Sequence, residues 1–316
     1  MIHPSDKERQ IYWLGKLATL NTARPDSRGI PPHKPIMLLC VMEMIEEGLI
    51  TDPWVPFGAQ IVMRFKNFWP LVQDRRQNNP EIIMPFHALG SERDGIWKTF
   101  TEDGTPSKAK STTRRCLLNS RLYDLLQDPG FRREARQVLI ESYFPPMEKV
   151  AFYVRLGLKE PESDELTKLR EDSAEYKISI RRARDQKFKS LVLNGYYQTC
   201  ALTGLRLVSE EGCMVHAAHI HQHSVSGNDD PRNGLALTPD AHWLFDAGLW
   251  TVVTREDRLF IKVAVDRFQE SSPAGPRIAS FHGQPLCFHE HSLLRPDPVH
   301  FEWHRREHKL NDPPNF

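Results

Sequence analysis

The 316-residue chain has no long run of apolar residues. A helix that crosses a membrane needs about 18 or more in succession, and a secretory leader needs a shorter apolar run behind basic residues. The opening sequence, MIHPSDKERQIYWLGKL, contains no such run. We therefore expect neither membrane insertion nor secretion.

Cysteine is also scarce, because the chain has only five, an odd and widely scattered set. Disulfide-rich secreted domains carry an even number at close spacing, and structural zinc modules usually present a C-x-x-C pair, which does not occur here. The pattern indicates reduced thiols and a cytoplasmic protein. The cysteines are Cys40, Cys116, Cys200, Cys213 and Cys287.

Net charge gives little guidance, since 42 Lys and Arg face 41 Asp and Glu for a formal charge of +1. Nucleic-acid-binding domains usually show a clear basic excess. The basic residues do gather in two segments, TPSKAKSTTRR at 105–115 and ISIRRARDQKFK at 178–189. Either segment is a candidate for phosphate contacts, and the alternative is a solvated surface. The candidate contacts are Lys108, Lys110, Arg114, Arg115, Arg181 and Arg182.

The most informative segment is HAAHIHQHSVSGNDDPRNGLALTPDAHWLFD at 216–246. Apolar and polar residues alternate around 214–221, which predicts a short strand. SVSGNDDPRNG predicts a loop and LALT a second strand. Thr238, Pro239 and Asp240 provide an N-cap, a first-turn proline and an acid, so a helix should begin there. A two-stranded ribbon packed on a helix is expected.

This arrangement brings together the groups that phosphodiester hydrolysis requires. A base must take a proton from water, and a divalent cation must stabilise charge that builds on the phosphate and leaving oxygens. We predict that His219 is the base and that His242, on the helix, is a metal ligand through a neutral ring nitrogen. Asn233 neither titrates nor attacks, so it should fix the loop and the orientation of the base.

These residues resemble the HNH endonucleases with the ββα-metal core. The matching elements are Cys-Ala-x-Thr-Gly at 200–204, Ala-Ala-His-Ile at 217–220, Asn-Gly-Leu-x-Leu at 233–237 and His-x-x-Phe-Asp at 242–246. The resemblance implies a metal-dependent DNA endonuclease that uses Mg²⁺ or Mn²⁺, with His219, Asn233 and His242 as the catalytic set.

One position departs from the wider family, which often has an aspartate as second metal ligand where this chain has Ala218. His216 is the candidate substitute, because two residues earlier on a strand returns to the same face. The alternatives are Asp246, His221, His223 and Asp230. A different interpretation is a structural zinc site built from the histidine cluster with Cys200 and Cys213, although its spacing is not typical of zinc modules.

The chain length favours two domains, and the overall class is α+β. We expect a mixed α/β DNA-binding domain at 1–147, a charged linker at 148–177 and the ββα-metal domain at 178–316. Helices are predicted at 6–20, 34–48, 116–127 and 130–142, and strands around 60–65, 81–86 and 95–100. The second domain should end in a hairpin (LWTVV, REDR, LFIKVAV) and a helical segment, FEWHRREHKL.

The first domain carries a second resemblance. PPHKP at 31–35, PFHAL at 85–89 with DGIW at 94–97, and YFP at 143–145 resemble the DNA sulfur-binding domain of McrA-type, phosphorothioate-dependent restriction endonucleases, where it precedes an HNH domain. An HNH core mostly contacts the DNA backbone, so the first domain would supply the specificity.

This resemblance implies an apolar cup that prefers sulfur over a phosphate oxygen, because sulfur is larger and accepts hydrogen bonds more weakly. Tyr143 and Pro145 are candidates to line the cup, and the alternative is that they form a buried helix end. His87 matches a position that makes a polar contact near the modified linkage. The family often has arginine next to it, where this chain has Ala88.

The two resemblances predict a modification-dependent restriction endonuclease that binds phosphorothioated double-stranded DNA and cuts nearby. Cutting both strands needs two active sites, so a homodimer is expected. The alternatives are an HNH restriction enzyme that reads a methylated or hydroxymethylated base, a DNA-binding regulator that does not cleave, and a structural zinc-binding interaction protein.

Overall fold

The chain folds into two compact units, residues 1–186 and 187–316. The computed structural model describes residues 4–23, 26–76, 79–92, 95–161, 174–209, 211–271, 275 and 277–310. Within these ranges, no helix is both long and apolar enough to cross a membrane. The mixed helix and strand content confirms the predicted α+β class.

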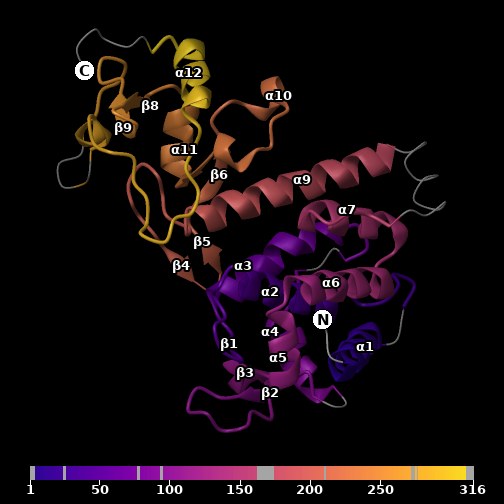
Figure 1. The fold of residues 1–316 in the computed structure, drawn as a ribbon. Coiled ribbons are helices and arrows are strands. Elements are labelled where there is room, and N and C mark those ends of the chain that lie inside the picture. Colours follow the sequence, from indigo (N-terminus) through magenta and orange to yellow (C-terminus); the bar gives the residue numbers. More distant parts are fainter. Residues whose placement is uncertain are drawn as a thin grey trace. The chain divides into compact units, whose positions relative to one another are not determined.

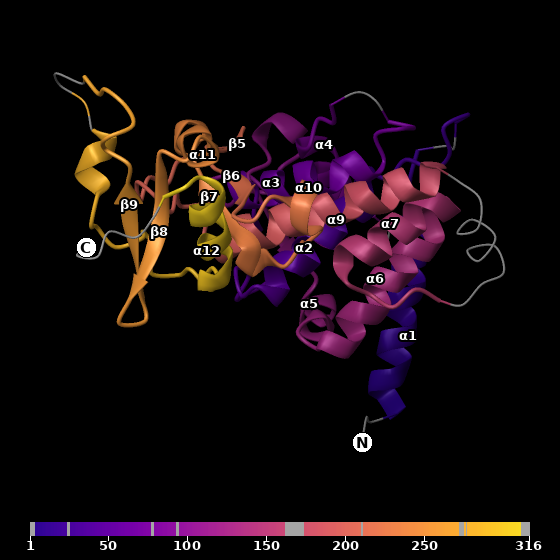
Figure 2. The same ribbon diagram turned by 90° about the horizontal axis from the view of Figure 1, so that it is seen from above.

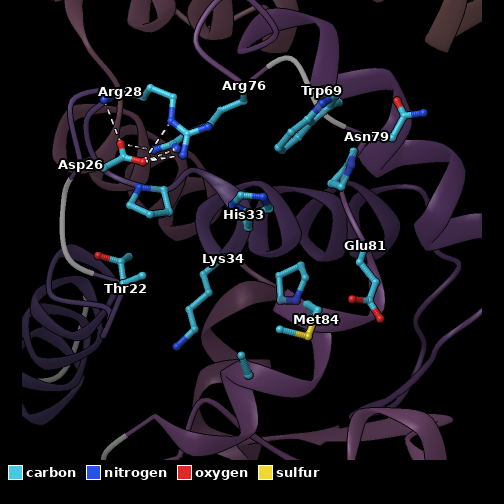
Figure 3. A pocket seen from close by; sticks show the side chains of 15 residues that line it. Thr22, Asp26, Arg28, His33, Lys34, Trp69, Arg76, Asn79, Glu81 and Met84 are labelled. Atoms are coloured by element: carbon cyan, nitrogen blue, oxygen red, sulfur yellow. Dashed lines mark hydrogen bonds and ion pairs between the residues drawn. The ribbon is translucent and has the colours of Figure 1, made fainter.

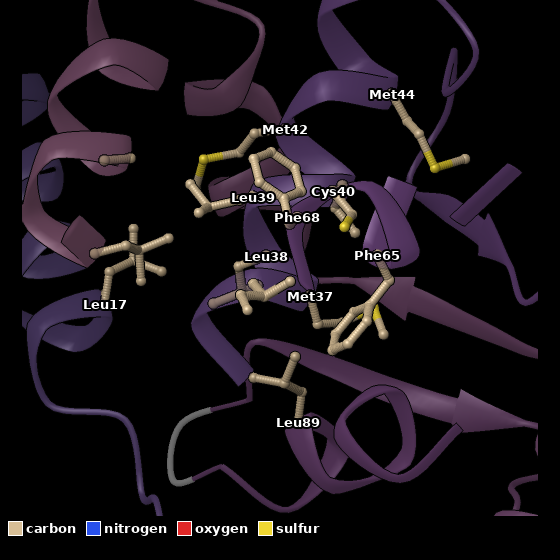
Figure 4. Close-up of a cluster of buried hydrophobic side chains, with 14 of the residues drawn as sticks. Leu17, Met37, Leu38, Leu39, Cys40, Met42, Met44, Phe65, Phe68 and Leu89 are labelled. Carbon is tan, nitrogen blue, oxygen red and sulfur yellow. The ribbon is translucent and has the colours of Figure 1, made fainter. Parts of the chain in front are cut away.

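The first unit is mainly helical and is organised around one buried helix (Figure 1). Helix α2 (His33–Glu46) is apolar on almost every face, which is the pattern of a helix enclosed by protein. Figure 4 shows its side chains among Leu17, Phe65, Phe68 and Leu89. The other helices are α1 (Pro4–Ala18), α3 (Ala59–Phe68), α4 (Ile83–Ala88), α5 (Ser120–Leu126), α6 (Pro129–Tyr143) and α7 (Pro146–Leu156), with turns η1 (Trp69–Leu71), η2 (Leu89–Ser91) and η3 (Lys110–Thr112).

A small antiparallel sheet completes this unit. It contains β1 (Trp54–Pro56), β2 (Trp97–Phe100) and β3 (Arg115–Leu118) in the order β1-β3-β2. Cys116 of the central strand faces Val55 on one side and Thr99 on the other, and it is fully buried. The connection between β2 and β3 contains the short turn η3 and carries most of the first basic segment.

Three sequence predictions for this unit were wrong in element type. The segment 60–65 belongs to helix α3, where Ile61, Phe65 and Phe68 are buried at helical spacing. The segment 81–86 leads into helix α4. The helix expected at 116–127 starts as strand β3 and becomes helical only at α5. Short apolar stretches suit either structure, and tertiary packing decides between them.

The boundary between the two units lies later than the sequence suggested. Most of helix α7 lies within the expected 148–177 linker, yet Phe152 is buried against Phe68 and Phe144 of the first unit. Helix α9 (Ala174–Gly195) passes through the boundary between Gln186 and Lys187. The remainder of the predicted linker, 162–173, lies outside the described residues.

The second unit contains the predicted ribbon and helix. Its elements are β4 (Val208–Ser209), β5 (Gly212–Cys213), β6 (His216–His219), α10 (His223–Ser226), η4 (Pro231–Asn233), β7 (Gly234–Leu237), α11 (Pro239–Asp246), β8 (Trp250–Arg255), β9 (Arg258–Val263), η5 (Ile278–Phe281) and α12 (Pro298–Glu307). The end of α9 packs so closely on the ribbon that a Cβ at Gly234 would lie 2.4 Å from Val192. Only glycine fits there.

The expected hairpin and final helix are also present, as β8 paired with β9 and as α12 beside β8 (Figure 2). His304 of α12 is buried in this contact. One ring nitrogen lies 3.0 Å from the Thr251 hydroxyl and the other 3.0 Å from the Phe245 carbonyl oxygen. The ring also stacks on the Phe245 ring with centroids 3.8 Å apart. Burial, with a smaller effect of His308, lowers the pKa of His304 to about 3.

This buried histidine should make the second unit sensitive to acid. Between pH 6.5 and 3 the unfolded chain binds a proton at His304 that the folded chain does not, so the free energy of unfolding should fall by up to about 1.4 kcal/mol per pH unit as pH decreases. Urea unfolding of wild type and His304→Gln at pH 7 and pH 5 tests this, because the variant should lose less stability between the two. The exposed His291 gives a control, and an equal loss in wild type and His304→Gln would refute the prediction.

Candidate functional site

The ribbon places the predicted catalytic residues around one short strand. β6 pairs with β7 in antiparallel register, with His219 opposite Gly234 and His216 opposite Leu237. Ala218 is buried between them, and Asn233 comes directly before β7. The register follows from the apolar face of Ala218 and Leu235, since a shift of one residue would expose that face.

Asn233 is fully buried and closes the loop between the strands. Its side-chain oxygen accepts a hydrogen bond from the His221 amide at 2.8 Å. Its side-chain nitrogen donates to the carbonyl oxygens of His221 at 2.9 Å and Asn228 at 3.1 Å. One amide therefore holds both ends of the connection 221–228, which is the arrangement expected of a scaffold residue.

His219 is held by contacts on its face and at its edge. Its ring stacks on Phe188 of α9 with centroids 3.8 Å apart and an interplanar angle of 2°. Its Nε2 lies 3.5 Å from Oδ1 of Asp229, and His223 Nε2 lies 3.3 Å from the same oxygen. About a quarter of the His219 side chain is exposed. The ring is therefore held in place with its Nε2 buried, while another part of the side chain is exposed.

The predicted metal ligand His242 lies on α11. Its Nε2 is 3.4 Å from Oδ2 of Asp246, one helical turn later, and both side chains are partly exposed. Burial lowers the pKa of His216, and the nearby His242 and Lys189 lower it further. The electrostatic effect of His242 on His216 indicates that the two rings lie near each other, and His242 and Asp246 are the pair in contact.

The donors in this group suit a divalent cation in chemical type. Imidazole nitrogen and carboxylate oxygen both bind Mn²⁺, and Mg²⁺ is typically held by one or two carboxylates together with water and substrate phosphate. Across the described residues, no three His, Cys, Asp or Glu side chains are already arranged as a metal cluster. His242 and Asp246 therefore offer two protein donors, and the other positions would be left to His216, water or phosphate.

The other candidate ligands have different surroundings. His221 stacks on Trp303 with centroids 4.0 Å apart, and Asp230 binds Arg232 at 2.7 Å. Cys200 is buried, and its sulfur lies 3.7 Å from the Thr238 hydroxyl. Thr238 occupies the predicted N-cap position but makes no capping hydrogen bond with its side chain. Burial raises the pKa of Cys213, which disfavours the thiolate that zinc requires.

In the first unit, His87 and the first basic segment lie side by side. His87 Nδ1 is 2.7 Å from the hydroxyl of the buried Thr113. That hydroxyl also contacts the Ser107 hydroxyl at 2.9 Å, so the loop 107–113 is anchored beside α4. The structure therefore brings a predicted polar contact next to predicted phosphate contacts.

The six basic candidates differ in how much of their charge is already neutralised. Lys108, Arg114 and Arg181 are exposed. Lys110 binds Glu81 at 2.7 Å, and Arg182 binds Asp74 at 2.6 Å. The guanidinium of Arg115 lies 4.6 Å from the centre of the Trp54 ring. The last three contribute to the fold of the unit, whereas the exposed three are open to a ligand.

Tyr143 and Pro145 are not equivalent. Tyr143 is buried, and its hydroxyl accepts a hydrogen bond from the Leu20 amide at 2.5 Å and donates one to the Leu17 carbonyl at 3.0 Å. Burial raises the pKa of this hydroxyl to about 12. Pro145 is exposed at the start of α7. The structure therefore agrees with the alternative in which Tyr143 belongs to a buried helix end.

A pocket of about 560 Å³ opens next to α4 (Figure 3). Its apolar lining includes Trp69, Met84, Pro85 and Ala88, so the position where the sulfur-binding family often has arginine faces this pocket. Its polar side includes Asp26, whose carboxylate binds Arg28 and Arg76, and these bonds hold its pKa at about 2.

Comparison with protein families gives two matches. Residues 12–161 match the model described as "ScoMcrA-like, DNA sulfur-binding domain". Residues 200–253 match the model described as "HNH endonuclease". The chain joins a DNA sulfur-binding domain to an HNH endonuclease domain. No curated protein matches the chain.

The matched ranges include most of the predicted site residues. The HNH domain contains His216, His219, Asn233 and His242, and the sulfur-binding domain contains His87, the 105–115 segment, Tyr143 and Pro145. Arg181 and Arg182 lie outside both matches. HNH nucleases generally use a divalent metal ion, which agrees with the predicted cofactor class.

Sequence reasoning missed two residues of the HNH site, Asp229 and Phe188. Asp229 stands in the loop sequence GNDDPRN beside Asp230, which the sequence offers as an alternative ligand. Phe188 lies in the basic segment 178–189, where the charged residues give the stronger signal. A carboxylate within the loop of an HNH motif was an available signal for Asp229, whereas the stacking of Phe188 depends on how α9 packs.

Tyr143→Phe separates a structural role from a DNA-binding role. Loss of the hydroxyl leaves two buried backbone groups without their partner, so the free energy of unfolding should fall by about 1–3 kcal/mol while DNA affinity stays unchanged. Chemical denaturation and DNA titration of the same variant measure the two effects. Tyr123→Phe is the control, because no described group hydrogen-bonds its hydroxyl. Weaker DNA binding at unchanged stability would place Tyr143 at the DNA interface instead.

Proposed function

We propose that this protein is a modification-dependent restriction endonuclease that recognises phosphorothioated double-stranded DNA and hydrolyses phosphodiester bonds nearby. The observation that carries the proposal is the presence in one chain of a DNA sulfur-binding domain and of an HNH domain with His219 and Asn233 at the ribbon and His242 on the helix that follows it. We also predict that this nuclease acts on cellular DNA in the cytoplasm.

In the HNH domain, His219 would accept a proton from the attacking water. Its ring, stacked on Phe188 and exposed over about a quarter of the side chain, supports this role. Asn233 would keep the loop and the strand end in place through its three hydrogen bonds. His242 and Asp246, with His216 as a further donor, would hold a divalent cation. When bound, Mg²⁺ or Mn²⁺ supplies electrostatic stabilisation of the negative charge on the reacting phosphate.

In the sulfur-binding domain, α4 and the 107–113 loop would contact the modified backbone. His87 is held at this place by Thr113, and the exposed Lys108 and Arg114 can contact neighbouring phosphates. Sulfur is polarizable and accepts hydrogen bonds weakly, so it favours apolar surroundings. Met84, Pro85 and Ala88 offer such a surface beside His87, and Pro145 offers a second exposed apolar group.

The proposal is tested with matched duplexes of one sequence, one phosphorothioated and one unmodified, incubated with protein and Mg²⁺ or Mn²⁺. We expect cleavage of the modified duplex only, and loss of that cleavage with His219→Ala or when the metal is chelated. Cleavage of both duplexes would support nuclease activity and contradict sulfur recognition. Binding without any cleavage would indicate a DNA-binding regulator.

A second candidate, recognition of a methylated or hydroxymethylated base, is favoured by one observation. The pocket beside α4 contains the rings of Trp69 and His33, and its volume of about 560 Å³ is larger than a single sulfur atom requires. Readers of base marks usually take a flipped base into such a pocket. A methylated duplex and a hydroxymethylated duplex in the same experiment distinguish the candidates, since preferential cleavage of either would favour this function.

We also propose that the active form is a homodimer. Each chain carries one HNH domain, and two active sites are needed to cut both strands of a duplex. Sedimentation of the pure protein, free and bound to phosphorothioated DNA, should show the mass of two chains in at least the bound state. A strict monomer in both states would contradict this part of the proposal.

A further inference from the structure

We propose that the exposed indole of Trp243 contacts DNA at the HNH site, where it packs against the nucleotide next to the phosphate that is cleaved. The inference rests on the proposed function, because it takes His242 and Asp246 as donors to a divalent cation that meets this phosphate. It adds to the site a residue that contacts the substrate and lies outside the predicted catalytic set.

Helix α11 presents Trp243 on the side that faces away from the core. Ala241 and Phe245 are buried and mark the inward side of the helix. Each residue turns by about 100° around the helix axis, so Trp243 lies opposite these two. Trp243 is 66% exposed, whereas tryptophan is usually mostly buried. The hydrophobic core therefore gives no reason for a tryptophan at this position.

The indole of Trp243 also has no partner in the part of the chain that the structure describes. Its side chain makes no hydrogen bond and no ring contact with any of these residues. The two other tryptophans of this unit differ. The Trp250 indole donates to the Ala241 carbonyl oxygen at 3.0 Å, and the Trp303 ring stacks on His221. Both of those rings stabilise the fold, whereas the Trp243 ring is open to a ligand.

The position of Trp243 on the helix makes it a neighbour of both groups of the proposed cation pair. It directly follows His242, and it lies three residues before Asp246, a spacing at which Cβ atoms are roughly 5–6 Å apart. The side chains of His242 and Asp246 approach to 3.4 Å, and both are partly exposed. A phosphate reaches a cation held by this pair from the solvent side of α11. The nucleotide next to that phosphate then comes within reach of the indole.

The charge near α11 favours DNA as the ligand. Lys189 of α9 is exposed, and its charge and that of His242 both lower the pKa of His216, which places both groups near that ring. A divalent cation together with Lys189 outweighs the carboxylates of Asp240 and Asp246, so this surface attracts phosphates. A nucleotide complements the surface in two ways, because its phosphate binds the cation and its apolar ring face packs on the indole.

The test compares wild type with Trp243→Ala and Trp243→Phe in the full-length protein. Leu293→Ala is the control, because Leu293 is an apolar residue of the same unit, is 89% exposed, and belongs to neither the ribbon nor α11. All three variants should keep the stability of wild type in urea denaturation, because neither side chain packs in the core. A change in DNA binding or cleavage is then not an effect of unfolding.

The first measurement is the rate of cleavage of a phosphorothioated duplex over a range of DNA concentrations. Trp243→Ala should raise KM roughly 5- to 100-fold, because an aromatic contact to a nucleotide is lost. The value of kcat should change less, since the indole touches neither the attacking water nor the cation. Trp243→Phe should recover part of the affinity, and Leu293→Ala should match wild type. An unchanged KM in Trp243→Ala, or an equal rise in Leu293→Ala, would overturn the inference.

The second measurement asks whether DNA covers the indole, and it needs no cleavage. His219→Ala protein, with and without the added change Trp243→Phe, is titrated with the same duplex in Mg²⁺. The difference between the two fluorescence signals isolates Trp243 from the other tryptophans. Bound DNA should protect this signal against quenching by acrylamide. Unchanged quenching at a concentration where the duplex is bound would reject the contact.

The rival occupant of this surface is a second copy of the chain. Sedimentation of wild type and Trp243→Ala without DNA tests it. A dimer that becomes a monomer in the variant would assign the indole to the contact between copies and overturn the inference.

The measurements separate failure of this inference from failure of the proposed function. If wild type binds the duplex without cleaving it, the fluorescence experiment still decides whether DNA covers Trp243. Cleavage by a protein whose Trp243 stays uncovered would keep the proposed function and reject the contact. Binding of neither a phosphorothioated nor an unmodified duplex would reject both.

Discussion

The buried side chain of Asn233 is the interaction on which the HNH site depends. Its amide makes three hydrogen bonds, two to His221 and one to Asn228, and its own backbone binds Ile220 and Asp230. A buried amide with all its partners satisfied fixes a loop more strictly than apolar contacts do, because hydrogen bonds are directional and a lost partner is costly. The loop GNDDPRN is polar and has only the short turn η4 as regular structure, and it acquires one conformation for this reason.

The two histidines of the short strand β6 lie beside different neighbouring elements. His219 lies against Phe188 of α9, whereas His216 lies within the electrostatic reach of His242 on α11. Alternation along a strand sends these two histidines to different sides. The predicted proton acceptor and the predicted further metal donor thus lie close in the sequence, yet each has its own environment.

The sulfur-binding domain is built around a buried helix and buried or largely buried ion pairs. Helix α2 is enclosed by apolar side chains, and Arg155 of α7 reaches Glu43 of α2 at 3.0 Å with both side chains buried. Arg75 and Glu148 form a second such pair at 2.6 Å. Removing one partner of such a largely buried pair is costly, because the other charge is left buried without compensation. These pairs tie α7 to the domain, although its sequence is charged enough to resemble a linker.

The sequence by itself determined that a sulfur-binding domain precedes an HNH domain and that the HNH segment has the ββα order, because turn residues, strand alternation and helix starts are local properties. Tertiary structure alone decided the rest. Segments 60–65 and 81–86 are helical because apolar stretches of that length fit either form until a core selects one. Tyr143 is buried because its hydroxyl bonds the backbone of Leu17 and Leu20 at the end of α1. Asp229 lies near His219 because Asn233 holds the loop against the strand. Contacts between residues far apart in the chain leave no local pattern from which they can be predicted.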